Sequence, residues 1–267
     1  MMIYEQKTFL LDMDGTIYLG DELIEGAHYF FDILKKYHKN WYFLTNNSSK
    51  DRKDYVDKLQ RLGIEATEDD IFTSADATLL YLRKQYPHAK NLFVIGTPAL
   101  EHLFKEAGYQ VFSNKRRAID LVVLGFDTTL TYEKLWFGCD LIREQIPYIA
   151  THPDFNCPIE KGKFMPDIGA MIAFIKASTG MEPEIVGKPN KIMIDSLCSL
   201  KDLNKKDLVM VGDRLYTDIK TGIHANIKTA LVLSGETDRT LYNQSDIVAD
   251  YVYDSIYEIA KEIEANL

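Results

Sequence analysis

FLLDMDGT, at residues 9–16, joins an apolar run directly to two acidic residues. The apolar run at residues 9–11 is typical of a buried strand in a parallel sheet. Side chains two residues apart in a strand project to the same side, so we expect Asp12 and Asp14 to meet just past the strand end. Adjacent carboxylates repel and usually need a cation or a shared proton. Parallel sheets place their chemistry at this edge, although a surface turn is the ordinary alternative.

The composition is that of an ordinary globular protein. The 267 residues allow one large domain or two moderate ones, with 46% hydrophobic and 27% charged residues. The net charge of −9 argues against binding a nucleic acid polymer. The chain has no run of 18 apolar residues, no apolar signal region at residues 1–7, and three widely spaced cysteines. We therefore expect a cytoplasmic protein with no membrane partner, present as a monomer or a homodimer.

Apolar runs alternate with helical periodicity, which predicts an α/β fold with a doubly wound parallel sheet. Strands are expected at 41–44, 208–211 and 230–233, with a closing helix at 256–263. Further strands are expected at 92–95, 121–124 and 148–150, with a helix starting at Thr97-Pro98. Ser48 and Asp51 have capping-box spacing before another helix. We predict a core of residues 1–78 plus 184–267, interrupted by an inserted α/β domain at 79–183.

Four groups of polar residues follow the predicted strands or lie in Gly-rich turns. They are Asp12/Asp14, Thr45/Asn46, Lys188 within Gly-Lys-Pro, and Asp213 with Asp218 five residues later. Each group alone fits a turn or a helix cap, but together they suit phosphoryl transfer. A carboxylate can act as the nucleophile, and a hard cation such as Mg²⁺ must then offset its repulsion of the phosphate.

The remaining residues supply the other parts of such a site. Asp213 adds a second metal-binding carboxylate beside Asp12, and Lys188 adds positive charge for the phosphoryl oxygens. Thr45 and Asn46 supply hydrogen-bond donors. Asp14 is then the general acid and afterwards the general base.

The order of these motifs resembles the haloacid dehalogenase-like (HAD) hydrolase superfamily, and most closely its NagD-like, p-nitrophenyl-phosphatase subfamily. The resemblance covers essentially the whole chain and implies a Rossmann-like core with an inserted cap. It implies that Asp12 is the nucleophile and a Mg²⁺ ligand, and that Asp14 adds its backbone carbonyl to the metal. Asp213 would bind Mg²⁺ directly, and Lys188 would steady Asp12. Asp218 would not bind the metal itself but would orient metal-bound water or Asp213.

In this superfamily the cap selects the substrate. The candidates here are His152 and Asp154, which follow a predicted strand, and Asp167 in Met-Pro-Asp-Ile-Gly. Family members often carry Gly where this chain has Asp167, and an acidic residue at a helix N-terminus is the simpler explanation of that position. The implied activity is Mg²⁺-dependent hydrolysis of small phosphomonoesters, such as sugar phosphates, nucleoside monophosphates and p-nitrophenyl phosphate, through an aspartyl-phosphate.

Other functions remain open at this point. A phospho-acceptor signalling module or a ligand-binding α/β protein without turnover would also use acidic residues, a Thr and a Lys. Receiver domains are much shorter and have no inserted cap, which favours the enzyme. Halide displacement has no need for Asp14, and phosphonate cleavage would want a cap lysine that no motif here singles out. A transport ATPase would need membrane helices.

Overall fold

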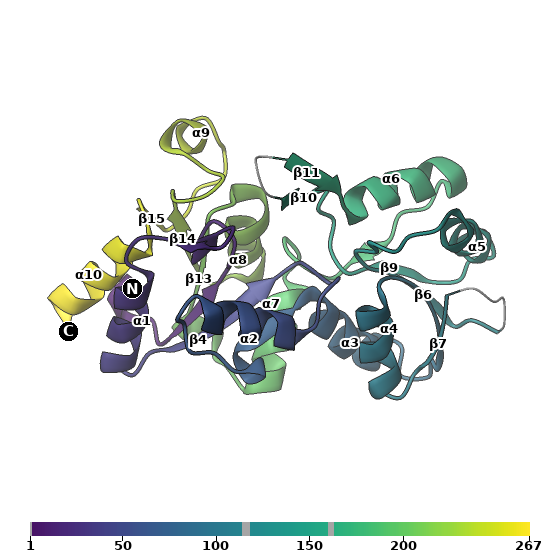
Figure 1. The fold of residues 1–267 in the computed structure, drawn as a ribbon, viewed down its shortest axis with the longest axis horizontal. Helices are drawn as coiled ribbons and strands as arrows, with labels where there is room; N and C mark the ends of the chain where they lie inside the picture. The colour runs from purple at the N-terminus through teal and green to yellow at the C-terminus, as the bar shows by residue number, and fades with distance from the viewer. Residues whose placement is uncertain (1, 114–117, 160–162) are drawn as a thin grey trace. The chain divides into compact units, whose positions relative to one another are not determined.

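The computed structural model describes residues 2–113, 118–159 and 163–267, and the chain forms two compact units (Figure 1). Unit 1 comprises Met1–Thr45, Arg52–Phe72 and Lys188–Leu267. Unit 2 comprises Asn46–Asp51 and Thr73–Gly187. These junctions differ from the sequence-based ones at 78/79 and 183/184, because no change in composition marks the joins. The assignment of residues 79–183 as a substrate-specificity domain stays a prediction.

Unit 1 contains a six-stranded sheet whose paired strands β1, β4, β13, β14 and β15 run parallel. The strand order is β15-β14-β13-β1-β4-β5. The central strands are fully buried, which explains their continuous apolar runs. The strands are β1 (Thr8–Leu11), β4 (Asn40–Thr45), β5 (Ile71–Thr73), β13 (Leu208–Gly212), β14 (Lys228–Val232) and β15 (Tyr251–Tyr253).

Helices cover both faces of the sheet in unit 1, as the prediction of a doubly wound sheet requires. Helices α1, α2 and α10 pack on the face that carries Phe9 and Leu11. Helix α8 packs on the other face, where Gly222 lies against Met210 and Thr229. The helices are α1 (Ala27–Lys36), α2 (Arg52–Arg61), α7 (Ile192–Lys201), α8 (Lys220–Ala225), α9 (Arg239–Asn243) and α10 (Ile256–Asn266).

Short elements complete unit 1 and connect its strand ends. A hairpin of β2 (Tyr18–Leu19) and β3 (Glu22–Leu23) follows β1. A π-helix at Leu215–Ile219 follows β13 and leads into α8. Single 3₁₀ turns lie at Ile3–Glu5, Glu68–Asp70 and Lys205–Asp207.

Unit 2 is a second α/β layer around a five-stranded sheet of order β12-β9-β8-β6-β7, with parallel pairing. Helices α5 and α6 cover the face that carries Phe93 and Ile95, and Leu100 of α4 packs against Gly96 and Gly125. The elements are α3 (Ser74–Gln85), β6 (Asn91–Ile95), α4 (Pro98–Glu106), β7 (Gln110–Phe112), β8 (Leu121–Leu124), α5 (Tyr132–Arg143), β9 (Tyr148–Ala150), α6 (Ile168–Thr179), β12 (Glu184–Ile185), and the antiparallel hairpin β10 (Asn156–Ile159) and β11 (Lys163–Pro166).

Two predicted helix starts had different outcomes. Thr97 caps α4 as predicted, with its hydroxyl accepting from the Leu100 amide. The capping box at Ser48 is wrong, because α2 begins only at Arg52. The Ser48 hydroxyl instead lies 2.9 Å from the Thr151 hydroxyl and accepts from the Phe126 amide at 3.0 Å. Tertiary hydrogen bonds within unit 2 thus take the place of the local cap.

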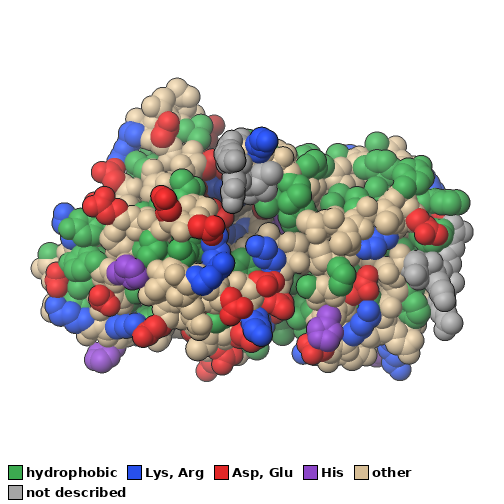
Figure 2. Space-filling model, viewed as in Figure 1, with side chains coloured by type: hydrophobic (Ala, Val, Ile, Leu, Met, Phe, Trp, Pro, Cys, Tyr) green, Lys and Arg blue, Asp and Glu red, His purple; other side chains and the backbone are tan. Residues whose placement is uncertain are grey.

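The helices of the described residues are all too short or too polar to cross a membrane. Acidic and basic side chains are intermixed on the face drawn in Figure 2.

Candidate active site

The candidate site of unit 1 forms where two neighbouring parallel strands end. Strand β1 pairs with β13 in a register that aligns Leu11 with Val211. The Asp12 amide continues this ladder by donating to the Val211 carbonyl at 2.9 Å. Asp213 follows β13 at the same edge of the sheet, so the topology itself brings Asp12 and Asp213 together.

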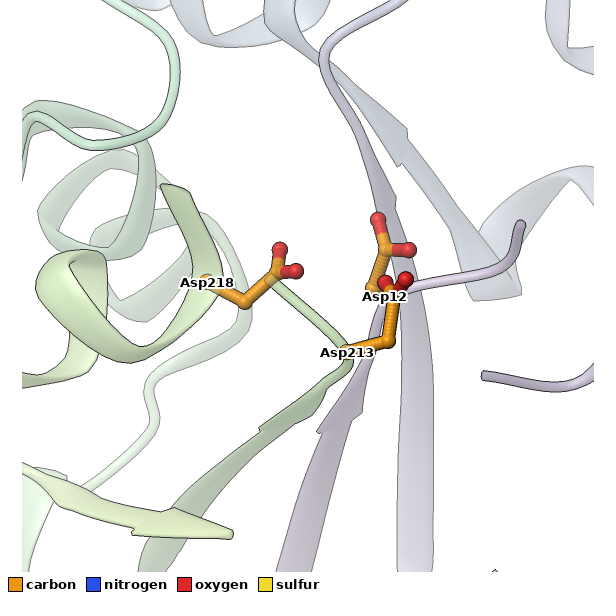
Figure 3. A group of neighbouring side chains, drawn as sticks. All are labelled: Asp12, Asp213 and Asp218. Carbon is orange, nitrogen blue, oxygen red and sulfur yellow. The ribbon is translucent and has the colours of Figure 1, made fainter. Parts of the chain in front are cut away.

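Asp218 completes a group of three carboxylates (Figure 3). One carboxylate oxygen each of Asp12, Asp213 and Asp218 lies within 4.8 Å of the others. Asp218 comes from the π-helix and is fully buried. It can approach because residue 212 is glycine: a Cβ there would lie 2.3 Å from the Asp218 Cβ. Gly212 is therefore required for the cluster to close.

Lys188 links two of these carboxylates from inside the protein. Its Nζ donates to Asp12 Oδ1 at 2.5 Å, to Asp218 Oδ1 at 2.7 Å and to the Leu44 carbonyl at 3.3 Å. The side chain is almost completely buried. Burial opposes the charged ammonium, but the two carboxylates outweigh burial and raise the pKa of Lys188. Lys188 therefore stays protonated in this site.

The carboxylates themselves are not fully neutralised by protein cations. Burial, together with the charge of Asp218, raises the pKa of Asp12 to about 6, although Lys188 opposes this. Burial and the charges of Asp12 and Asp218 raise the pKa of Asp213 to about 8. Arg214 adds positive charge nearby and forms an ion pair with Glu236 at 2.9 Å. The raised pKa values mean that burial and mutual repulsion disfavour ionisation of these carboxyl groups, and a bound cation would favour their ionised forms.

The donor set fits a hard divalent cation. Asp213 Oδ2 accepts from the Glu236 amide at 2.7 Å. Within the described part of the chain, the buried Asp213 Oδ1 has no hydrogen-bond partner. A buried carboxylate oxygen without a donor is costly unless something else satisfies it. Oxygen ligands of this type are those that Mg²⁺ takes, commonly one or two carboxylates with water and phosphate completing the shell.

Asp14 does not join this carboxylate group as the sequence pattern suggested. Strand β1 ends at Leu11, and the backbone then turns through Gly15, which has a φ of +85°. Asp14 itself forms an isolated bridge with Tyr18 and is exposed. Alternation of side chains holds only while the strand continues, so Asp14 lies outside the group of Asp12, Asp213 and Asp218, and the expected pairing of Asp12 with Asp14 stays a prediction. An exposed carboxylate at this turn can still exchange protons with solvent.

Thr45 and Asn46 lie at the end of β4 but belong to different units. Thr45 is the last residue of β4 and is half-buried in unit 1. Asn46 is buried in unit 2, where its Nδ2 donates to Asp154 Oδ2 at 3.0 Å. Their roles in binding phosphate stay predictions.

The three proposed specificity residues form a cluster in unit 2. His152 is buried, with Nδ1 3.5 Å from Asp154 Oδ2 and Nε2 3.8 Å from Asp167 Oδ1. Asp167 is the N-cap of α6 and accepts from the Ile168 amide at 2.6 Å. Burial, opposed by His152, raises the pKa of Asp167. The helix-capping explanation of Asp167 is confirmed, whereas a role in choosing the substrate stays a prediction.

The loop after β14 contacts the site, although none of the motifs singled out in the sequence includes it. Ser234, Gly235 and Glu236 follow this strand at the same edge of the sheet as Asp12, and the Glu236 amide contacts Asp213. The motif Ser-Gly-Glu-Thr directly after a buried strand was a usable signal, because it repeats the placement of the other site motifs.

The fold and the acidic cluster define an α/β protein with a candidate cation site at the ends of its parallel strands, and comparison with known proteins identifies its family. The sequence profile of the haloacid dehalogenase-like hydrolases matches residues 9–110, and a second HAD-like hydrolase profile matches residues 185–259. The chain is 34% identical to an acid sugar phosphatase of Staphylococcus epidermidis over 258 residues, which covers 97% of this chain and 98% of the relative.

Solved structures agree with this result. A 4-nitrophenylphosphatase from Thermotoga maritima superimposes with a TM-score of 0.92 at 41% identity, covering 98% of both chains. A glycerol phosphate phosphatase from Mycobacterium tuberculosis in complex with magnesium has a TM-score of 0.89 at 26% identity, covering 97% of this chain and 78% of that one. The chain belongs to the haloacid dehalogenase-like hydrolases and, within them, to the NagD-like group.

Proposed function

We propose that this chain hydrolyses small phosphomonoesters in a Mg²⁺-dependent reaction with an aspartyl-phosphate intermediate on Asp12. The chain is a phosphoric monoester hydrolase, since relatives along its whole length are phosphatases. The observation that carries the finer proposal is the buried group Asp12, Asp213 and Asp218 with Lys188 against two of its members. A nucleophile, a cation site and a fixed positive charge are thereby collected at one strand edge.

Asp12 is suited to attack because Lys188 orients one of its oxygens. One Asp12 carboxylate oxygen forms a bond to phosphorus while the bond from phosphorus to the ester oxygen breaks. The leaving oxygen takes a proton from Asp14, the general acid. Asp14 then accepts a proton from water, whose oxygen attacks phosphorus and releases phosphate and free Asp12. The exposure of Asp14 supports this role, because an exposed carboxyl group can reach a substrate and re-equilibrate with solvent.

Three groups of this chain would bind the metal ion. Asp12 and Asp213 are the proposed side-chain ligands, and the Asp14 carbonyl is the proposed backbone ligand. When bound, Mg²⁺ supplies the positive charge that lets an anionic carboxylate approach an anionic phosphate. Lys188 and Thr45 would contact the phosphoryl oxygens, with Asn46 as a further donor. Asp218 accepts hydrogen bonds from Lys188 Nζ and, at 3.1 Å, from the Arg214 amide. These bonds support a role in which Asp218 orients the groups that bind the metal and does not bind the metal itself.

Sugar phosphates are the proposed substrate class, with nucleoside monophosphates and p-nitrophenyl phosphate as further esters. The support is the name of the Staphylococcus relatives, which are acid sugar phosphatases. Residues 79–183, with His152, Asp154 and Asp167, are the proposed selectors. We further propose that the enzyme works in the cytoplasm as a monomer or homodimer.

Steady-state hydrolysis of p-nitrophenyl phosphate and a panel of sugar phosphates tests the proposal, with Mg²⁺ or with EDTA. We expect turnover that EDTA abolishes and that the Asp12→Asn variant loses by a factor on the order of 10⁴ or more. Acid quenching during turnover should trap a phosphoryl group on Asp12 in the wild type. Full activity in purified Asp12→Asn would exclude the aspartyl-phosphate, and a stable phosphoprotein without turnover would instead indicate a phospho-acceptor.

A further inference from the structure

The loop at residues 234–237, which follows β14, connects the two sides of the carboxylate cluster. The Glu236 amide donates to Asp213 Oδ2 at 2.7 Å, and the Thr237 amide donates to the Asp213 carbonyl at 3.3 Å. The Ser234 hydroxyl donates to the Gly15 carbonyl at 2.8 Å. One short loop thus contacts both Asp213 and the turn that follows Asp14.

Backbone encloses the Asp213 carboxylate on two sides. A Cβ at Gly15 would lie 2.4 Å from Asp213 Oδ2, and a Cβ at Gly235 would lie 2.1 Å from the same oxygen. Both distances are far below van der Waals contact, so any side chain at these positions would displace the carboxylate. The Asp213 carboxylate therefore occupies the space that a side chain at residue 15 or residue 235 would need.

An ion pair joins the loop to Arg214, the residue that follows Asp213. Arg214 Nε lies 2.9 Å from Glu236 Oε2, and the Arg214 side chain is only 20% exposed. The Arg214 amide also donates to Asp218 Oδ2 at 3.1 Å. Glu236 thus holds Asp213 through its backbone and Arg214 through its side chain.

We propose that the 234–237 loop is a positioning element that selects which Asp213 oxygen faces the cation. Oδ2 is occupied by the Glu236 amide, and the buried Oδ1 lacks a hydrogen-bond partner among the described residues. Such groups behind a ligand orient it and tune its affinity for the metal. The same loop fixes the Gly15 turn, so it sets the spacing between Asp213 and Asp14. This inference rests on the proposed magnesium site at Asp213.

The test compares Ser234→Ala and Gly235→Ala with the wild type by calorimetric titration of Mg²⁺ without substrate. We expect dissociation constants about 10- to 100-fold higher in both variants, the range seen when a group behind a ligand is lost. Ser234→Thr keeps the hydroxyl and should restore the affinity of Ser234→Ala. Thr240→Ala, at an exposed position of α9, is the matched control and should bind Mg²⁺ as the wild type does.

Two further measurements separate positioning from misfolding. If the loop only positions Asp213, saturating Mg²⁺ should restore most of the kcat of Ser234→Ala, and its unfolding temperature in EDTA should match the wild type. An unchanged Mg²⁺ dissociation constant in both folded variants would overturn the loop's role. If wild type and Asp213→Asn bind Mg²⁺ equally, the proposed metal site itself fails, which is a different result. Should Gly235→Ala not fold, Ser234→Ala and Ser234→Thr still decide the question.

Discussion

Both units hold acidic residues near strand ends, but the two clusters differ in what satisfies them. Asp213 directly follows the parallel strand β13, whereas Asp154 lies in the loop after β9 and Asp167 follows the antiparallel strand β11. In unit 1, Asp213 Oδ1 is left without a hydrogen bond in the described structure and the pKa of Asp213 is raised to about 8 by burial and neighbouring charges. In unit 2, the Asn46 amide donates to Asp154, and the Ile168 amide donates to Asp167. Among the described residues, the buried atom without a hydrogen bond is a carboxylate oxygen in the unit 1 cluster, Asp213 Oδ1, whereas in the unit 2 cluster it is a ring nitrogen, His152 Nε2.

This difference in hydrogen bonding distinguishes a carboxylate cluster that can bind a cation from one whose carboxylates are bonded within the protein. In unit 2, Asp154 accepts a hydrogen bond from the Asn46 side chain, and Asp167 accepts one from the Ile168 amide as the N-cap of α6. In unit 1, Lys188 is the side-chain cation hydrogen-bonded to Asp12 and Asp218, while Arg214 pairs with Glu236. We therefore expect the unit 1 cluster to respond to cations and phosphate, and the unit 2 cluster to respond to changes of substrate.

Of the changes considered, removing Lys188 should have the largest effect on stability and on kcat. Lys188→Met leaves Asp12 and Asp218 buried without their shared cation, which typically costs about 3–5 kcal/mol of stability. The loss of a fixed charge from the site should lower kcat by about 10²- to 10³-fold. Urea unfolding and the hydrolysis of p-nitrophenyl phosphate measure the two effects.

The matched control for Lys188→Met is Lys228→Met. Lys228 forms an ion pair with Asp250 at 2.5 Å that is partly exposed, with side-chain exposures of 40% and 31%. Pairs of this kind contribute about 0.2–1 kcal/mol, and this one lies outside the cluster, so activity should be unchanged. A Lys188→Met enzyme within threefold (roughly 0.7 kcal/mol) of wild-type kcat would remove Lys188 from the proposed mechanism.

Mg²⁺ should stabilise the protein through unit 1 only. At about 100 times its dissociation constant, a ligand that binds only the folded state adds about 2.7 kcal/mol to the free energy of unfolding. Asp213→Asn should lose most of this gain, because it replaces a charged oxygen ligand. Asp154→Asn should keep it, although that residue also lies in an acidic cluster. Thermal unfolding with Mg²⁺ and with EDTA measures the shift, and equal shifts in the two variants would contradict the contrast between the units.

Much of the fold was predictable because buried parallel strands have a clear signature. The strands at 121–124 and 148–150 coincide with β8 and β9, and the class of fold is confirmed by its relatives. The short strand β12 (Glu184–Ile185) was not predicted, because two residues carry no periodicity. The bounds of the inserted domain at residues 79–183 stay a prediction, since the chain passes between units without a change in composition.

The candidate site was predictable in its residues but less so in its geometry. Asp12 and Asp213 come together because adjacent parallel strands end at one edge, which a motif order can reveal. The hydrogen bond from Lys188 to Asp218 depends on the π-helix that contains Asp218, and no local sequence pattern indicates this π-helix. The exposure of Asp14 depends on where β1 ends, and a strand end is fixed by tertiary contacts as well as by sequence.

A smaller effect should distinguish substrate choice from chemistry. Asp154→Asn removes the charge beside His152 while leaving an oxygen for the Asn46 amide. If unit 2 selects the substrate, the ratio of kcat/KM for a sugar phosphate to that for p-nitrophenyl phosphate should change about tenfold, or 1.4 kcal/mol. Side-by-side assays of both esters measure the ratio. An equal fall for both substrates would argue that Asp154 acts on folding or on the reaction itself.

The smallest effect concerns the pH dependence of stability at Asp167. Burial raises the folded-state pKa of Asp167 above 3.8, while His152 and the Ile168 amide oppose the rise and Asp154 adds to it. A raised carboxyl pKa means that its stabilising contribution is present at low pH and is lost as the pH rises through the folded-state value. Asn is about as good an N-cap as Asp, so Asp167→Asn should change capping by only a few tenths of a kcal/mol.

Asp167→Asn should therefore gain stability relative to the wild type as the pH rises from 3 towards neutrality (about the span over which such a carboxyl ionises). Asp250→Asn provides a control of opposite sign. Burial opposes ionisation of Asp250, but hydrogen bonds from Lys228 and Thr229 outweigh burial and lower its pKa. That variant should lose stability relative to the wild type over the same rise in pH. Urea unfolding across the pH series measures both, and parallel curves for Asp167→Asn and wild type would show that the unit 2 cluster accommodates a charged Asp167 without cost.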